Sequence, residues 1–124
     1  MLTGIGIDVV EINRFRAAMQ RHPRMLDRLF TKAEQKYCLG RKKSYLHFAV
    51  RFAAKEAILK SLGTGRSGIG WKDVEVKRAS TGAPEVILHE KAVNITSKKG
   101  ISKVMVSLAF SHTNAVATAV AVGS

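Results

Sequence analysis

The stretch YLHFAVRFAAKEAILKSL, residues 45–62, decides the fold. It contains no Pro and no internal Gly, and Gly63 follows it as a stop signal, so it predicts one long helix. At about 100° per residue most faces of this helix are apolar, which is typical of a buried helix. Glu56 falls beside Phe52 on an apolar face, and Lys60 follows one turn later. The pattern predicts a central buried helix that carries a carboxylate within its apolar surface.

Two interpretations of Glu56 follow. The plain one is an ion pair with Lys60 at i,i+4 spacing, which contributes ~0.3–0.5 kcal/mol on an exposed face. The other is a functional role, because a buried carboxylate must be paired, bind a cation or shift its pKa. The alanines around Glu56 allow another group to approach closely, and this setting favours the functional interpretation.

Upstream, residues 2–10 read as the first strand. Alternation places Gly4, Gly6 and Asp8 on one face and aliphatic side chains on the other. The glycines leave room for another element or a ligand to come close to the strand. Asp8 ends this glycine-lined face, where it is either the N-cap of the next helix or a functional carboxylate.

The segment between the strand and the central helix is strongly basic. A helix is expected over residues 12–20, and Thr31 with Glu34 forms a capping-box pattern that opens a short helix ending at Gly40. Residues 14–43 hold ten basic residues and only two acids, within a chain of net charge +12. Such a segment is usually a solvated face, but an excess of this size also steers an acidic partner. Nucleic acid, an anionic membrane, an acidic protein and a phosphorylated small molecule are the candidates.

The second half of the chain predicts strands. The glycine-rich residues 63–70 could cradle a phosphate or serve as a connector, and they lack the P-loop pattern. The expected elements are strands over 71–78 and 85–89 with a turn at 81–84, a helix over 90–99, and strands over 103–110 and 115–122. The order indicates an α+β fold in a single domain, residues 1–124. The last strand has no charge on either face, which predicts burial on both sides and an oligomer interface.

Length and composition limit the classes of protein to which this chain can belong. The chain has 124 residues, 46% of them hydrophobic, which suits one globular domain. No apolar run reaches membrane-spanning length, and the N-terminus lacks the basic region of a secretory signal. The single cysteine, Cys38, fits a reducing cytoplasm and reads as a packing residue. We therefore expect a cytoplasmic protein without a membrane span.

Two carboxylates stand out as candidate ligands for a metal ion. The sequence shows no Ser/His/Asp or Cys/His arrangement and no metal-ligand spacing among its histidines. Asp8 and Glu56 come from different elements in glycine- or alanine-lined settings, with Lys60 one turn from Glu56. Mg²⁺ typically takes one or two carboxylates and completes its shell with water and substrate phosphates. These residues together are similar to a magnesium–phosphate site.

Four motifs identify a family. They are GIGIDVVEI at 4–12, RFAAKEAILKSLGTG at 51–65, WKDVEV at 71–76 followed by GAP at 82–84, and SHT at 111–113. In this order the chain resembles the bacterial holo-[acyl-carrier-protein] synthases, a family of 4′-phosphopantetheinyl transferases, over essentially its whole length. Two departures are Ser61, where alanine is common, and residues 89–102, which are shorter in some members. The resemblance implies a single-domain phosphopantetheinyl transferase-like α+β fold, with an antiparallel sheet and packed helices.

The resemblance also implies a reaction. Coenzyme A gives its phosphopantetheine arm to a serine of apo-acyl carrier protein, for fatty-acid biosynthesis, and adenosine 3′,5′-bisphosphate is released. Mg²⁺ sits on Asp8 and Glu56, and Lys60 stabilises the phosphate oxygens. The base that takes the serine proton stays open among Asp8, a metal-bound water and Glu56 acting through water.

Binding residues are carried over by motif position. Arg51 and His112 are implied to contact the 3′-phosphate of coenzyme A, and the glycine turns to line the nucleotide. The implied coenzyme A-binding residues are Arg51, Lys60, Gly63, Gly65, Gly82, Pro84, Ser111, His112, Thr113, Lys42 and Lys43. The implied acyl-carrier-protein-binding residues are Arg14, Arg21, Arg24 and Arg28. A homotrimer is implied, with a site at each subunit interface and His112 near a neighbour's Asp8–Glu56 pair.

Two other classes of function compete with this one. A nucleic-acid-binding module would explain the net charge, but the basic segment lacks interleaved exposed aromatics and a nucleic-acid motif. A structural domain with a buried Glu56–Lys60 pair would leave Asp8 and the glycines unexplained. We expect no nucleic acid among the partners.

Overall fold

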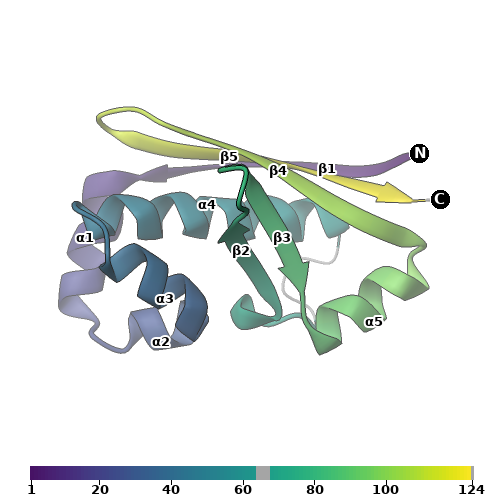
Figure 1. Cartoon of the computed structure of the whole chain (residues 1–124), viewed down its shortest axis with the longest axis horizontal. Helices are drawn as coiled ribbons and strands as arrows, with labels where there is room; N and C mark the ends of the chain where they lie inside the picture. Colours follow the sequence, from purple (N-terminus) through teal and green to yellow (C-terminus); the bar gives the residue numbers. More distant parts are fainter. Residues whose placement is uncertain (64–67, 124) are drawn as a thin grey trace.

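The computed structural model describes residues 1–63 and 68–123, and it shows an α+β fold with antiparallel sheets (Figure 1). The elements are β1 (Leu2–Glu11), α1 (Ile12–Arg21), α2 (Met25–Leu29), α3 (Lys32–Leu39), α4 (Ser44–Leu62), a 3₁₀ turn η1 (Trp71–Asp73), β2 (Val74–Arg78), β3 (Pro84–Leu88), α5 (Glu90–Lys98), β4 (Ile101–Phe110) and β5 (Asn114–Gly123). The predicted order of elements is confirmed.

The strands described form two sheets instead of one. The larger sheet has the order β1-β5-β4, and β2 pairs with β3 in a separate hairpin. Helix α4 runs along one face of the larger sheet, and the other helices and the hairpin lie on the same side (Figure 1). In this sheet Asp8 pairs with Ala117 and Glu11 with Asn114. The end of β1 therefore lies beside the β4–β5 turn.

Helix α4 begins at Ser44 and ends at Leu62, one residue longer than predicted. Gly63 ends it in the left-handed conformation, with φ +73°, and donates its N–H to the Lys60 carbonyl oxygen. Twelve of its residues are buried, as the apolar pattern indicates. Because α4 contacts all three strands of the larger sheet, it is the helix around which the molecule packs.

The glycines of β1 bring this strand into backbone contact with α4. A Cβ atom on Gly4 would overlap the carbonyl oxygen of Ser61, and one on Gly6 would overlap that of Ala57. The predicted close approach is confirmed, and the element that approaches is the central helix. Asp8 is the next residue on the same face of β1, so it stands against α4 one step further along.

A buried ion pair anchors α4 on the side away from β1. Lys55 Nζ lies 2.8 Å from Glu34 Oε1, and their side chains are 0% and 1% exposed. The same ammonium donates to the carbonyl oxygens of Trp71 and Val74, at 2.9 and 2.6 Å. All three ammonium protons therefore have acceptors. No sequence pattern indicated this role of Lys55.

The capping box predicted at Thr31 connects to this pair. The Thr31 hydroxyl accepts from the Glu34 N–H, and Glu34 Oε1 accepts from the Thr31 N–H. Glu34 Oε2 also accepts from the backbone N–H of Val76 in β2, at 2.8 Å. One carboxylate thus fixes the start of α3, the middle of α4 and the edge of β2.

One expectation about the strands is wrong, and one stays a prediction. The strand predicted over 71–78 begins only at Val74, because the first three residues form η1, where the Asp73 carboxylate accepts from the Gly70 N–H at 2.7 Å. The single chain buries one side of β5, and burial of its other side, expected from an oligomer contact, stays a prediction. The strand's alternate alanines (Ala115, Ala117, Ala119 and Ala121) are fully buried on the α4 side, while the residues between them are partly exposed.

The outer face of the larger sheet is apolar and open. On β1 the side chains of Ile5, Ile7 and Val9 are 68%, 56% and 57% exposed, and Met105 on β4 is 45% exposed. The register places Met105 and Ile5 on either side of Val120. This face, formed by Ile5, Ile7, Val9, Met105 and Val120, is called the outer sheet face below.

Cys38 confirms the packing interpretation. It is fully buried in the cluster that contains Phe30 and Phe48. Burial raises the pKa of its thiol to about 11, so the group stays protonated.

Candidate functional site

Asp8 and Lys60 form an ion pair that is open to solvent. Lys60 Nζ lies 3.0 Å from Asp8 Oδ1 and also donates to the Ile7 carbonyl oxygen at 2.9 Å. The Lys60 side chain is 53% exposed and that of Asp8 17%. The contact joins the end of the glycine face of β1 to the last turns of α4. Unlike Lys55 and Glu34, both groups remain accessible to a ligand.

Glu56 lies one turn before Lys60 on α4 and is partly exposed, less buried than its apolar neighbours predict. Side chains at i,i+4 lie about 5–6 Å apart at their Cβ atoms. Because Lys60 reaches Asp8, the Glu56 carboxylate stands about one helical turn from this contact. The structure therefore joins Asp8 of β1 to Lys60 of α4, with Glu56 one turn before Lys60 on the same side of the helix.

The donor set of Asp8 and Glu56 suits a hard cation. Within residues 1–63 and 68–123 no group of three or more His, Cys, Asp or Glu side chains could hold a metal ion. Mg²⁺ needs only one or two carboxylates when water and substrate phosphates supply the remaining oxygens. These two carboxylates therefore fit a Mg²⁺ ion that binds together with a phosphorylated substrate.

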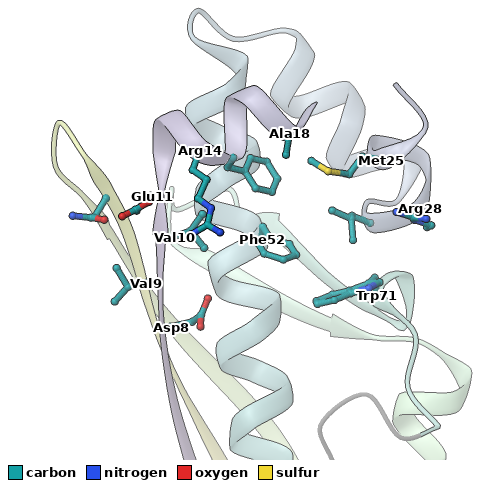
Figure 2. Close-up of a pocket in the computed structure, with 13 residues that line it drawn as sticks. Asp8, Val9, Val10, Glu11, Arg14, Ala18, Met25, Arg28, Phe52 and Trp71 are labelled. Atoms are coloured by element: carbon teal, nitrogen blue, oxygen red, sulfur yellow. The ribbon is translucent and has the colours of Figure 1, made fainter. Parts of the chain in front are cut away.

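A cavity of about 720 Å³ extends from Asp8 toward α1 and α2 (Figure 2). Phe52 and Trp71 line its apolar part, and Arg14 and Arg28 line it from the two helices. In Figure 2 Arg14 extends from α1 toward Phe52, above the Asp8 carboxylate. The cavity thus joins a carboxylate, an apolar surface and two arginines.

The four arginines assigned to a partner face (Arg14, Arg21, Arg24 and Arg28) are all exposed. None of them forms an ion pair with a carboxylate among the described residues. Arg14 and Arg28 reach the cavity beside Asp8, while Arg21 and Arg24 lie further along the same helical segment. Their charge is therefore available to an acidic partner.

On the other side of α4 a cavity of about 280 Å³ collects three predicted residues. Arg51, Gly82 and Pro84 line it together with Leu108 and Phe110 of β4. Gly82 has φ +91°, which suits the tight turn between β2 and β3. The β2–β3 turn is thereby held over the flank of α4.

An adjoining cavity of about 380 Å³ is lined by three more of the residues predicted to bind coenzyme A. Lys43, Ser111 and His112 line it, and it shares Leu46 and Phe110 with the previous cavity. The two cavities therefore meet, and they unite residues that are up to 69 positions apart in the sequence, from Lys43 to His112.

The remaining predicted residues differ in their placement. Gly63 lines a cavity beside β1 with Lys60 and Lys99, and Lys99 donates to the Leu62 carbonyl oxygen at 2.9 Å. Lys42 is exposed next to Lys43, and the Thr113 carbonyl oxygen accepts from the Ile12 N–H. Gly65 lies outside the described residues. Lys99 was not identified from the sequence because its lysine-rich surroundings look like solvated surface.

The predicted site residues thus fall into two groups on opposite flanks of α4. Arg51 and Lys60 are nine positions apart, which at about 100° per residue places them half a turn apart. The β1 flank carries Asp8, Glu56, Lys60 and Gly63, and the β4 flank carries Lys43, Arg51, Gly82, Pro84, Ser111 and His112.

The fold and the two flanks define a small α+β protein suited to a phosphorylated ligand, with carboxylates and a lysine on one flank and arginine with apolar cavities on the other. The family model described as the 4′-phosphopantetheinyl transferase superfamily matches residues 4–120. The chain is 47% identical over 116 residues to a holo-[acyl-carrier-protein] synthase of Moorella thermoacetica, covering 94% of this chain and 89% of the relative.

Solved structures indicate the same family as the sequence relatives. The chain matches the crystal structure of the holo-[acyl-carrier-protein] synthase of Neisseria meningitidis with a TM-score of 0.92 at 28% identity, covering 98% of this chain and 99% of that one. It matches the synthase of Bacillus anthracis, in complex with coenzyme A (3′,5′-ADP), with a TM-score of 0.83 at 31% identity, covering 100% and 99%. The chain belongs to the 4′-phosphopantetheinyl transferase superfamily, and it is an enzyme of this class. No helix in the described part of the chain is long and apolar enough to cross a membrane.

Proposed function

We propose that this enzyme transfers phosphopantetheine from coenzyme A to a serine of apo-acyl carrier protein, as a step that supplies fatty-acid biosynthesis. The observation that carries the proposal is the open Asp8–Lys60 pair with Glu56 one turn away. The names of the relatives and the coenzyme A complex of the Bacillus anthracis synthase support the same substrates.

The chemistry is a phosphoryl transfer. The serine oxygen forms a bond to the phosphorus that carries the pantetheine arm. The bond from this phosphorus to the bridging oxygen breaks, and adenosine 3′,5′-bisphosphate leaves with the electron pair. The serine proton passes to a base, for which Asp8 and Glu56 are the nearest carboxylates, either directly or through water.

Asp8 and Glu56 would hold Mg²⁺, which when bound neutralises charge on the pyrophosphate and the leaving group. Lys60, already poised beside Asp8, contributes a mobile point charge to the same oxygens. Because Lys60 is half exposed, it can move from the carboxylate to a phosphate at little desolvation cost.

The partner face follows from the exposed arginines. Arg14, Arg21, Arg24 and Arg28 would receive an acidic helix of the carrier protein. Arg14 and Arg28 line the cavity that ends at Asp8. A carrier bound on this face would therefore present its serine close to the β1 flank.

The enzyme would act as a homotrimer. The β1 flank has the carboxylates and Lys60, and the β4 flank has Arg51 and His112. The two flanks lie toward opposite edges of the β1-β5-β4 sheet. A head-to-tail contact would join the β1 flank of one subunit to the β4 flank of the next, and such contacts form a ring when the rotation between neighbours closes. The outer sheet face offers the apolar surface that such an assembly would bury. In this arrangement Asp8, Glu56 and Lys60 meet a neighbour's Arg51 and His112.

The remaining expectations are parts of the same proposal. Residues 1–124 would act as one transferase domain, and the family model spans nearly all of them. The cytoplasm suits the single thiol, Cys38, which is buried and protonated.

Mass spectrometry tests the reaction. Apo-acyl carrier protein incubated with the enzyme, coenzyme A and Mg²⁺ should gain the mass of phosphopantetheine. EDTA should abolish the gain, and excess Mg²⁺ should restore it. Unchanged carrier mass, with the same carrier modified by another phosphopantetheinyl transferase, would refute the proposal.

Light scattering tests the assembly. The wild type should have the mass of three chains, and Val120→Glu should dissociate it, because a charge on the outer sheet face costs several kcal/mol when buried. Lys91→Glu, at an exposed position of α5, is the matched control and should remain trimeric. A fully active monomer would refute the shared site but not the metal assignment.

A further inference from the structure

Tyr37 of α3 is surrounded by cationic side chains. The guanidinium carbon of Arg51 lies 4.2 Å from the centre of its ring, and that of Arg41 lies 4.4 Å from it. Arg78 of β2 interacts with the Tyr37 hydroxyl, and the His47 ring meets the Tyr37 ring edge-on at 6.0 Å. Three arginines from three segments of the chain thus converge on one phenol.

Their charge is not compensated within the described residues. Arg51 is 6% exposed, and its buried Nε atom has no hydrogen-bond partner there. Glu34 and Glu75 line a small cavity with Arg51, but both are committed elsewhere. Glu34 pairs with Lys55, and Glu75 accepts hydrogen bonds from Thr31 and His89. A buried guanidinium with an unused N–H calls for an anion.

The ionisation of Tyr37 reports the same excess of positive charge. Burial acts to raise the pKa of the Tyr37 hydroxyl, yet the interaction with Arg78 and the charges of Arg51 and Arg41 bring that pKa below its usual value. Packing alone would explain an arginine stacked on a ring. It does not explain why three like charges gather at one ring while the nearby carboxylates, Glu34 and Glu75, are paired with other groups.

The cluster opens into the cavity of the β4 flank. Tyr37, Arg51 and Arg78 line that cavity with Gly82, Pro84 and Phe110. Its other walls are apolar and include Leu46 and Val50. A ligand there meets an apolar surface at one end and guanidinium groups at the other, which suits a heterocycle that bears a phosphate.

We infer that Tyr37 is a positioning residue that holds Arg41, Arg51 and Arg78 as a recognition site for the phosphomonoester on the ribose of coenzyme A. The inference rests on the proposed function and goes beyond it, because it assigns the preference for coenzyme A over 3′-dephospho-coenzyme A to the Tyr37 ring. The ring fixes two guanidinium groups by stacking, and the hydroxyl fixes the third.

Steady-state kinetics with both donors at saturating apo-carrier protein tests the inference. Tyr37→Leu should raise the KM for coenzyme A about tenfold or more, the factor expected when charge-assisted hydrogen bonds to a phosphate are lost, and should leave the KM for 3′-dephospho-coenzyme A within about twofold. Tyr37→Phe keeps the stacking and should recover most of the preference. Lys36→Gln removes an exposed charge from the same helix and should change neither KM.

A purely structural role gives a different result. If Tyr37→Leu impairs both donors equally, or if the wild type does not distinguish them, the inference is wrong. Calorimetry separates this failure from failure of the proposed function, since it needs no transfer. The wild type should bind adenosine 3′,5′-bisphosphate at least about tenfold more tightly than adenosine 5′-monophosphate, and Tyr37→Leu should remove the difference. Equal wild-type affinities would overturn the inference even in an active enzyme.

Discussion

The two flanks of α4 differ in what they can do to a ligand. The β1 flank has two carboxylates and a lysine close together, which are groups for reaction chemistry. The β4 flank has arginine, histidine and apolar walls around two joined cavities, which are groups for recognition. Neither flank holds both sets, because Arg51 and Lys60 leave the helix in opposite directions. In the proposed trimer, a second subunit would bring its β4 flank to the β1 flank of the first.

The separation of the flanks depends first on the anchor of α4. Lys55→Met would leave the Glu34 carboxylate buried without its partner, so unfolding free energy should fall by about 3–5 kcal/mol. Lys60→Met, at the exposed pair, should lower it by less than about 1 kcal/mol. Urea unfolding of the two variants measures the contrast. Equal losses would mean that the buried pair does not anchor the helix.

The second-largest effect should be a loss of turnover when a carboxylate of the β1 flank is removed. Asp8→Ala and Glu56→Ala should each fold and lose turnover by about a hundredfold or more, because metal-ion stabilisation of phosphate charge amounts to several kcal/mol. The KM for carrier protein should change little. Turnover is measured at saturating Mg²⁺ with wild-type enzyme as the control. Near-normal activity of Glu56→Ala would remove Glu56 from the site.

Substitutions on the partner face should have a smaller effect, limited to the KM for carrier protein. Arg14→Glu or Arg21→Glu should raise the KM for carrier protein about tenfold, since each reverses a charge that faces an acidic partner, while the KM for coenzyme A stays nearly constant. Raised salt should weaken the wild-type association in the same direction. If both substrates suffer equally, the face is assigned wrongly.

The smallest effect concerns pH. Burial acts to raise the pKa of Glu75, but hydrogen bonds from His89 and Thr31 and the charges of His89 and Lys55 lower it below 4.5. A carboxyl with a lowered folded-state pKa stabilises the fold above its unfolded pKa, and this contribution is lost as pH falls through the folded value. Wild-type stability should therefore drop below about pH 4.5. In acid denaturation the unfolding free energy of Glu75→Gln should fall less steeply with decreasing pH. An unchanged profile would argue against a contribution from Glu75.

Much of the fold was predictable because local signals agreed with packing. The glycines of β1 indicated close approach, the capping box marked α3, and Gly63 ended α4. The buried Lys55–Glu34 pair was not predictable, because its partners are 21 positions apart and only the packed helices bring them together. Helical spacing offered Glu56 as one partner for Lys60, and it gave no sign that Lys60 reaches Asp8 across the β1–α4 contact.

The candidate site shows the same limit. Motifs named most of its residues and the resemblance implied a site shared between subunits, but neither said which residues lie on which flank of one chain. That division follows from the rotation of α4 against the sheet, which a list of motifs does not contain. Tyr37 was missed because an aromatic residue in an amphipathic helix reads as packing, and its cationic neighbours come from three segments.

The most direct test of the divided site is subunit complementation. Asp8→Ala breaks the β1 flank and Arg51→Ala breaks the β4 flank, so each variant alone should be nearly inactive at low coenzyme A. Co-expressed chains with separate tags, purified as mixed trimers, should regain a fraction of wild-type phosphopantetheine transfer, because some interfaces join two intact flanks. Mixed trimers that contain both chains yet transfer no more than the separate variants would contradict the account.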